Sequence, residues 1–283
     1  MNVLVSGALG RIGRYVVREL ANAGHRVSSI DVNADPGIDL PGRYLRADLT
    51  DAGQVYQAVA WAEPAAAIHL GAWSNSEIVP ETDTYGDNVR GSYNLFQACA
   101  DMGVCRVISA SSNQVYGFAG APPVYLPVDE AHPLRPVNAY ALAKIASEEA
   151  AEYFVRTRGM EILSFRFMGV RPPARIGAEI DAMQTDPATG ARLLWTRTDA
   201  RDAAAACRLA VEATDVEPGA YNIAGAQVVL QNSTAHLAAR YFGDRTQIRA
   251  PLEGHTSPLS CAKARRGFGY EPRYVWRWNR RYD

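Results

Sequence analysis

Residues 2–13 read NVLVSGALGRIG, and this stretch decides the fold. Its first five residues are largely apolar and rich in β-branched side chains, which predicts a buried strand. Three glycines follow at intervals of three residues, and an apolar helical pattern then continues to Gly24. A second predicted strand, residues 26–30, is followed by Asp31. Strand, glycine loop, helix, strand and terminal carboxylate together predict a βαβ unit.

The glycine spacing indicates a dinucleotide-binding loop; the alternative is a turn whose glycines serve only packing. Gly7 permits a tight turn, Gly10 lets the backbone approach a pyrophosphate, and Gly13 lets the helix pack closely on the sheet. The N-terminus of the helix then presents unpaired N–H groups to the phosphates. The cofactor contacts predicted in this loop are Gly7, Gly10, Arg11, Ile12 and Gly13.

Asp31 identifies the dinucleotide. It lies 18 residues after Gly13, close to the offset at which a carboxylate binds the ribose 2′-hydroxyl. The same carboxylate repels the 2′-phosphate of NADP, and Val32 and Asn33 supply no arginine to bind that phosphate. The predicted cofactor is therefore NAD.

The composition is that of a soluble enzyme. The chain has 283 residues and a net charge of −1, which gives no indication of nucleic acid or an anionic membrane as a partner. It has no apolar run of the length that a membrane helix needs, and its first strand leaves no room for a signal peptide. The cysteines and histidines lack the spacing of a metal site, so no metal is predicted. The four cysteines are expected to be reduced, and a cytoplasmic location is expected.

Strand and helix patterns alternate along the first 166 residues, which predicts an α/β fold with a Rossmann-type doubly wound parallel sheet. Helices are expected at about 51–61, 88–102 and 138–157, and strands at 43–47, 65–70, 106–110 and 161–165. Ligands bind at the carboxyl ends of such strands. The polar or small residues predicted to converge there are Asp31, Asp48, Gly71, Ala72 and Ser112.

The alternating pattern ends after Arg166. Residues 172–173 and 184–190 are expected to be loop, followed by a helix at 199–213, a strand at 220–224 and a helix at about 234–242. The predicted NAD-binding domain comprises residues 1–168 with about 199–224. A smaller substrate-binding lobe is predicted from about 169–198 and 225–283.

Tyr140 and Lys144 are four residues apart on a predicted helix, and therefore share one face. A lysine ammonium beside a tyrosine favours the phenolate and lowers the pKa of the tyrosine. A tyrosine tuned in this way can accept a proton at neutral pH. The alternative is a surface helix that happens to carry both residues.

These motifs together resemble the extended short-chain dehydrogenase/reductase family, the NAD-dependent epimerase/dehydratase group, over nearly the whole chain. The resemblance implies that Tyr140 is the general acid/base, that Lys144 lowers its pKa and binds the nicotinamide ribose, and that Ser112 binds the reacting oxygen. It also implies that Asn88 helps to orient Lys144. Further cofactor contacts implied by position are Asp48, Leu49, Leu70, Gly71 and Ala72.

Residues 111–117, SSNQVYG, are similar to the substrate loop of uronate dehydrogenases, which oxidise carbon 1 of a sugar acid to a lactone. The resemblance implies that Ser74, Asn113 and Gln114 contact the substrate. It matches Arg192 to the arginine that pairs with the substrate carboxylate, although Arg192 is equally consistent with a surface arginine.

The chain departs from the uronate dehydrogenase pattern at three places. Gln114 replaces a histidine, Trp73 replaces a smaller residue, and the stretch 171–190 is longer. A neutral aldose, a sugar phosphate or a sugar lactone therefore fits equally well. The expected activity is NAD-dependent oxidation of a free aldose or uronate. The alternatives are a nucleotide-sugar epimerase or dehydratase, a non-catalytic dinucleotide sensor and an assembly protein.

The resemblance also implies a homodimer, formed through the helices that begin near Asn88 and Asn138.

Overall fold

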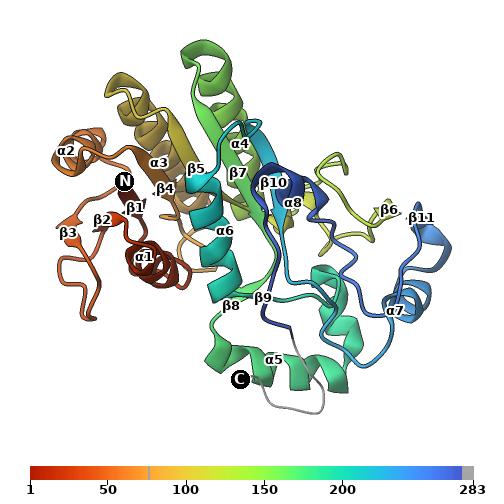
Figure 1. Cartoon of the computed structure of the whole chain (residues 1–283). Helices are drawn as coiled ribbons and strands as arrows, with labels where there is room; N and C mark the ends of the chain where they lie inside the picture. Colours follow the sequence, from red (N-terminus) through yellow and green to blue (C-terminus); the bar gives the residue numbers. More distant parts are fainter. Residues whose placement is uncertain (76, 276–283) are drawn as a thin grey trace.

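The computed structural model describes residues 1–75 and 77–275. Within these residues, seven strands form one parallel sheet in the order β10-β7-β5-β4-β1-β2-β3 (Figure 1). The order reverses between β1 and β4, which is the switch point where doubly wound sheets bind ligands. The predicted fold class is thus confirmed. The strands of the sheet are β1 (Asn2–Ser6), β2 (Arg26–Asp31), β3 (Arg43–Arg46), β4 (Ala66–His69), β5 (Arg106–Ser112), β7 (Glu161–Phe167) and β10 (Gly219–Ile223).

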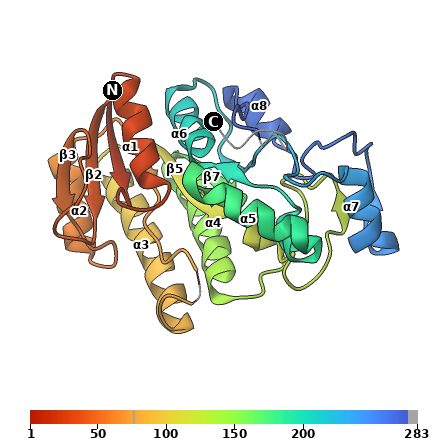
Figure 2. The same ribbon diagram turned by 90° about the horizontal axis from the view of Figure 1, so that it is seen from below.

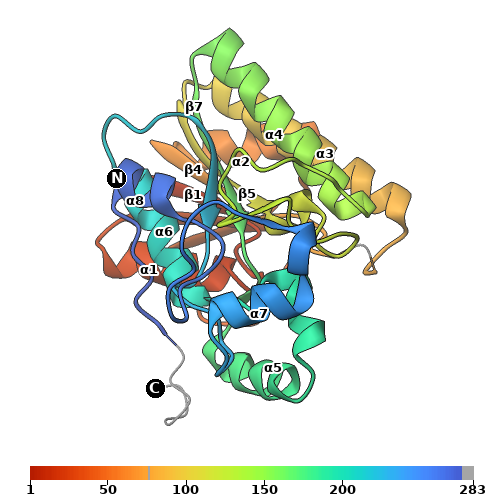
Figure 3. The same cartoon turned by 90° about the vertical axis from the view of Figure 1, so that its right-hand side faces the viewer.

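Helices cover both faces of the sheet (Figure 2). On one face, α1 (Gly13–Asn22) and α6 (Ala200–Glu212) pack against each other; the alanines of α6 allow this close approach. On the other face lie α2 (Ala52–Ala62), α3 (Glu81–Asp101) and α4 (Ala139–Arg158). Figure 3 shows α3 and α4 side by side along one flank of the molecule.

Helix α3 begins seven residues before the predicted start at Asn88. Pro80 precedes it in an extended conformation, and Glu81 and Asp83 lie in its first turn. Carboxylates in this position interact favourably with the positive end of the helix dipole.

The C-terminal third contributes a separate core around the fully buried Trp195. Besides α6 and β10, the part of the chain after β7 contains β8 (Val170–Arg171), α5 (Pro173–Thr185), η2 (Pro187–Leu193), β9 (Thr198–Asp199), α7 (Thr234–Tyr241), η3 (Gly243–Arg245), β11 (Gln247–Ile248) and α8 (Ala262–Phe268). Residues from the first half also enter this core through η1 (Asn113–Tyr116) and β6 (Tyr125–Leu126). Conversely, Phe268 of α8 stacks on Phe165 in the core of the sheet. The division into two lobes therefore stays a prediction, because segments of each predicted lobe pack into the core of the other.

The expectation of loop at residues 172–173 and 184–190 is wrong, because α5 and η2 occupy most of these residues. Pro173 lies in the first turn of α5, where its missing N–H costs no hydrogen bond. Ile176, Ile180 and Met183 form a buried stripe on this helix, and the stripe packs into the C-terminal core.

Throughout residues 1–75 and 77–275, each helix is too short or too polar to cross a membrane.

Candidate functional site

The glycine loop joins β1 to α1 at the switch point. Gly7 has a φ of +67°, and a Cβ there would overlap the backbone of Gly71 in the neighbouring loop. A Cβ at Gly13 would overlap the carbonyl oxygen of Gly7. The predicted roles of these glycines in the turn and in helix packing thus have a direct steric basis. The loop leaves its backbone open to a cavity on its outer side.

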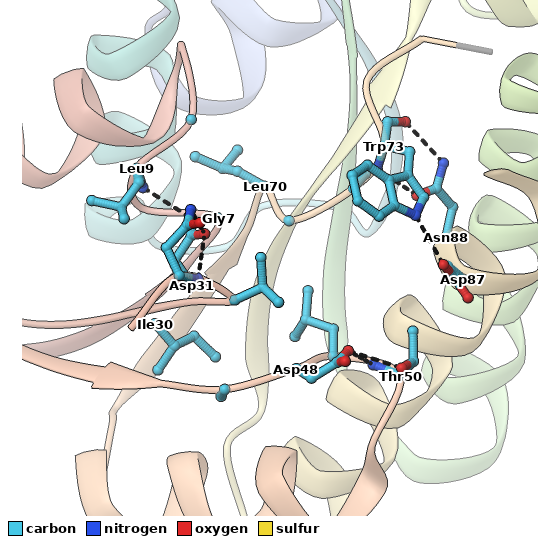
Figure 4. A pocket seen from close by; sticks show the side chains of 17 residues that line it. Gly7, Leu9, Ile30, Asp31, Asp48, Thr50, Leu70, Trp73, Asp87 and Asn88 are labelled. Atoms are coloured by element: carbon cyan, nitrogen blue, oxygen red, sulfur yellow. Dashed lines mark hydrogen bonds between the residues drawn. The ribbon is translucent and has the colours of Figure 1, made fainter. Parts of the chain in front are cut away.

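A cavity of about 380 Å³ extends from this loop across the ends of β1, β2 and β4 (Figure 4). Its walls include most of the residues that the sequence predicts to contact the cofactor. They are Gly7, Gly10, Asp31, Asp48, Leu49, Leu70, Gly71 and Ala72. The residues thus meet in space as predicted, although they come from four separate loops.

The carboxylates of this cavity are held in fixed positions. Asp31 accepts a hydrogen bond from the Leu9 N–H at 3.0 Å, which ties the end of β2 to the glycine loop. Asp48 accepts from the N–H and the hydroxyl of Thr50, at 2.9 and 2.8 Å through the same oxygen. Figure 4 shows Asp31 and Asp48 on separate walls of the cavity.

Asn88 closes one end of the same cavity. Its side-chain oxygen accepts from the Trp73 N–H at 2.8 Å, and its side-chain NH₂ donates to the Trp73 carbonyl at 3.0 Å. The indole of Trp73 donates to Asp87 at 2.9 Å. The side chain of Asn88 therefore fixes the loop that carries Trp73. Its predicted action on Lys144 stays a prediction.

A second cavity of about 730 Å³ continues from the glycine loop toward the C-terminal lobe. It brings together the remaining predicted site residues, which come from the glycine loop and the start of α1, the loop after β4, β5, η1, α4 and η2. They are Arg11, Ile12, Gly13, Ser74, Ser112, Asn113, Gln114, Tyr140, Lys144 and Arg192. Because Tyr140 and Lys144 are four residues apart on α4, both face the end of β5 in this cavity.

Tyr140 is 9% exposed and Lys144 is 2% exposed. The Lys144 Nζ lies 5.7 Å from the centre of the Tyr140 ring. Burial raises the pKa of Tyr140, while a hydrogen bond with Ser112 and the charge of Arg11 lower it. Burial lowers the pKa of Lys144 to about 8, and Glu148 opposes this effect. The sequence predicts that Lys144 lowers the pKa of Tyr140. In the structure, the groups with this effect are Ser112 and Arg11.

A buried hydroxyl network supports the site and was not predicted. His69 contacts the Ser6 hydroxyl at 2.8 Å and the Ser92 hydroxyl at 3.1 Å, and Ser92 donates to the Asn88 carbonyl. Ser147 of α4 donates to Ser92 at 3.1 Å. Burial, together with the charge of Lys144, lowers the pKa of His69 to about 3, so this histidine is neutral. The network joins β1, β4, α3 and α4 below the cavity; a lone buried histidine gives no sequence signal for it.

The predicted substrate residues line the larger cavity from different sides. Ser74 accepts a weak hydrogen bond from Arg11 at 3.4 Å, and Gln114 accepts from Asn138 at 3.1 Å. Asn113 is buried at the start of η1. Arg192 lies in the last turn of η2, with its side chain exposed to the cavity.

Arg171 also lines this cavity and was missed. It pairs with Glu179 of α5, which pairs in turn with Arg197 at 2.9 Å. These contacts hold β8, α5 and β9 together around the open end of the cavity. Arg171 lies in a stretch predicted to be irregular, so the sequence offered no period to place it.

The sequence profile of the NAD dependent epimerase/dehydratase family matches residues 3–224. The chain belongs to this family. The profile covers the whole sheet and stops at the end of β10, before α7 and α8.

The curated proteins to which this chain is similar have more than one activity. A UDP-glucose 4-epimerase of Lactobacillus helveticus is 30% identical over 60% of this chain and 52% of its own length. An L-arabinose 1-dehydrogenase (NAD(P)(+)) of Haloferax volcanii is 28% identical over 75% of this chain and 83% of its own length. A uronate dehydrogenase of Pseudomonas syringae pv. tomato is 31% identical over 58% of each chain. The chain thus spans about half the length of the first curated relatives it matches.

A solved structure confirms the architecture over the full chain. A short-chain dehydrogenase/reductase superfamily protein from Agrobacterium tumefaciens, crystallised with bound NAD, superposes with a TM-score of 0.74. It is 24% identical, and the match covers 96% of this chain and 93% of that one.

The cavities of this chain fit NAD, the dinucleotide of the family. The glycine loop excludes side chains where a pyrophosphate would lie, Asp31 can hold a ribose, and Asp48 and Leu49 can hold an adenine. Tyr140 and Lys144 line the larger cavity beyond the loop, and their place at the nicotinamide end stays a prediction.

Proposed function

We propose that this chain oxidises a hydroxyl group of a sugar, most specifically carbon 1 of a free aldose or uronate to give a lactone, with NAD as hydride acceptor. The observation that carries the proposal is the convergence of Ser112, Tyr140 and Lys144 in a cavity that continues from the dinucleotide cavity. NAD bound in these cavities supplies the hydride acceptor.

The side chains of the site supply the proton chemistry and the orientation. Tyr140 accepts the proton of the sugar hydroxyl, and Ser112 donates a hydrogen bond to the reacting oxygen. Arg11 and Lys144 add positive charge around the phenol, which favours the phenolate as the proton arrives. Burial of Tyr140 keeps water away from the exchanged proton.

The far end of the larger cavity sets the choice of sugar. Ser74, Asn113 and Gln114 offer neutral hydrogen-bonding groups suited to sugar hydroxyls. Arg192 offers a guanidinium that can bind a carboxylate through two hydrogen bonds. This set of groups supports a uronate before a neutral aldose.

A nucleotide-sugar epimerase is the second candidate, supported by the epimerases among the relatives. A dehydratase is disfavoured because Asn113 and Gln114 take the place of the carboxylate pair it usually carries. A non-catalytic sensor is disfavoured because the chain keeps both Tyr140 and Lys144 in one buried site.

The decisive experiment is NADH formation, followed at 340 nm, from purified protein, excess NAD and a panel of free aldoses, uronates and UDP-sugars. Saturating NADH formation with one class of free sugar establishes a net dehydrogenase. Interconversion of UDP-sugars without NADH release, with NAD retained by the protein, establishes the epimerase instead.

Replacing Arg192 with alanine should lower kcat/KM for a uronate by about 10- to 100-fold, because a charge-assisted hydrogen-bond pair is worth roughly 1.5–3 kcal/mol. The same change should leave kcat/KM for the corresponding neutral aldose within about 2-fold. Arg240→Ala removes an equal charge from the exposed face of α7 and is the matched control. An equal loss for both sugars would show that Arg192 does not contact the carboxylate.

We also propose a homodimer formed by the outer faces of α3 and α4. These helices lie side by side on one flank of the molecule (Figure 3), and they expose large apolar side chains. The side chains are Tyr85, Tyr93, Leu142 and Tyr153, with exposures between 39% and 47%. Patches of this kind on a soluble protein mark contact surfaces.

Leu142→Glu should convert a dimer of about twice 30.8 kDa into a monomer, as measured by size-exclusion chromatography with light scattering. A buried unpaired carboxylate opposes association. Ile248→Glu, on the exposed β11, is the control and should leave the mass unchanged. A wild-type monomer, or a dimer that persists in Leu142→Glu, would contradict this interface.

A further inference from the structure

A buried carboxylate lies directly behind the predicted catalytic residues. Glu148 is 8% exposed and follows Lys144 by four residues on α4, so the two lie on the same face of the helix. The hydroxyl of Ser111, the residue before Ser112, donates to its Oε1 at 2.5 Å. Glu148 therefore contacts the end of β5 and lies one helical turn from Lys144.

Arg166 of β7 holds this carboxylate in place. Its Nη2 lies 2.6 Å from Oε2 of Glu148, and its Nε lies 3.0 Å from Oε1. Its remaining donor, Nη1, is bound to the Tyr116 hydroxyl and to the Glu130 carbonyl. The pair is therefore nearly dry and fully hydrogen-bonded, which is the condition under which buried charges persist.

The groups around Lys144 differ sharply in charge. His69 approaches from β4 and is neutral, and Tyr140 on α4 presents its ring to Lys144. Arg166 is positive but lies beyond Glu148. Burial disfavours the ammonium form of Lys144, and Glu148 is the charge that opposes this loss.

We propose that Glu148 is a positioning residue: it supplies the buried counter-charge that keeps Lys144 cationic beside Tyr140, and it ties that charge to the strand end that carries Ser112. The catalytic part of this inference rests on the proposed function. A protonated lysine adds to the effect of Arg11, because the ammonium form of Lys144, unlike the neutral amine, favours the phenolate of Tyr140.

The sequence offers an unusually direct test. Lys144 and Lys263 are the only lysines of the chain, so lysine labelled with ¹³C at Cε gives a signal for each. Lys263 donates to the Ala220 carbonyl at 3.0 Å, in a different part of the fold, and serves as the internal reference. Titration by NMR, with and without saturating NAD, then follows the charge of Lys144 alone.

In Glu148→Gln the midpoint of the Lys144 titration should fall by about one pH unit or more, because a close opposite charge has been removed. Ser111→Ala breaks the hydrogen bond to Glu148 but keeps the charge, and should leave the midpoint unchanged. An unchanged midpoint in Glu148→Gln, or an equal fall in Ser111→Ala, would overturn the proposal. The first result would show that the Glu148–Arg166 pair serves folding only.

Loss of one partner of a buried pair often destabilises a protein, so Glu148→Gln can fail to fold. The double variant Glu148→Gln with Arg166→Met removes both charges and leaves no unpaired guanidinium. Its Lys144 midpoint should also fall, by less than in the single variant, because Glu148 is the nearer charge. A rise or no change would again overturn the proposal.

The pH profile of kcat/KM connects the charge to catalysis. Activity that needs the ammonium is lost as pH rises through the Lys144 midpoint, so in Glu148→Gln the alkaline limb should move to lower pH by the interval seen in the NMR titration. A limb that stays in place while the NMR midpoint falls would separate Glu148 from catalysis. If no sugar in the panel reacts, the proposed function fails while the NMR result still decides the counter-charge.

Discussion

Tyr140→Phe should lower kcat by about 10³-fold or more, within the range that a positioned acid or base contributes. The substitution removes only the hydroxyl, so the proton acceptor is lost while the ring keeps its packing. NAD affinity should change by less than about 2-fold, because the ring and Lys144 remain in place. NADH formation at 340 nm measures the first quantity, and calorimetric titration with NAD measures the second.

The pH dependence of the residual rate adds a second criterion. Burial raises the pKa of Tyr140, while the hydrogen bond with Ser112 and the charge of Arg11 lower it. Loss of the phenol proton should give the wild-type profile its acidic limb, at lower pH than the alkaline limb set by Lys144, and Tyr140→Phe should lose this acidic limb. Tyr153→Phe lies on the exposed face of the same helix and should behave as wild type. Turnover close to normal in Tyr140→Phe would remove the catalytic assignment.

The βαβ unit at the N-terminus was predictable because its requirements are local. A Cβ at Gly13 would overlap the Gly7 carbonyl, and a Cβ at Gly7 would overlap Gly71, so the sequence must place glycine there. Asp31 follows β2 directly, and parallel strands end at a common edge. Period, glycine spacing and strand order all indicate the same cavity, so the residues that line it can be predicted from the sequence.

The electrostatics of Tyr140 were only half predictable. Helical spacing correctly places Lys144 beside the phenol, since the pair depends on one helix alone. The contribution of Arg11 depends on how the glycine loop faces α4, and burial depends on the packing of the whole site. Such effects arise between distant segments, and no local pattern reports them.

The same reason explains why Glu148 and Arg166 were missed. Neither belongs to a motif, and they are 18 residues apart on a helix and a strand. Each alone is an ordinary charged residue in an amphipathic pattern. Only the packing of α4 on β5 and β7 shows that they meet in the interior, next to Ser111.

Asp31→Ala should lower the preference for NAD over NADP, as the ratio of their kcat/KM values, by about 10- to 100-fold. A carboxylate that binds the ribose 2′-hydroxyl contributes roughly 1.5–3 kcal/mol to NAD binding, and the same charge repels a 2′-phosphate. Both effects change the ratio in the same direction. Rates with each dinucleotide, at saturating sugar, measure it.

Asp31 also holds the glycine loop in place, and this effect must be distinguished from its effect on the preference for NAD over NADP. It accepts the Leu9 N–H at 3.0 Å, so alanine also loosens the glycine loop and should weaken both dinucleotides. Asp31→Asn keeps a side-chain oxygen for Leu9, removes the charge, and replaces the oxygen that accepts from Asn33 with an NH₂ group. It should therefore recover most of the affinity lost in alanine while the preference stays low. Asp35→Ala, an exposed aspartate four residues on, controls for net charge. If the preference for NAD over NADP were unchanged in both Asp31 variants, another group in the cavity would bind the 2′-hydroxyl. Asp31 would then only hold the glycine loop in place.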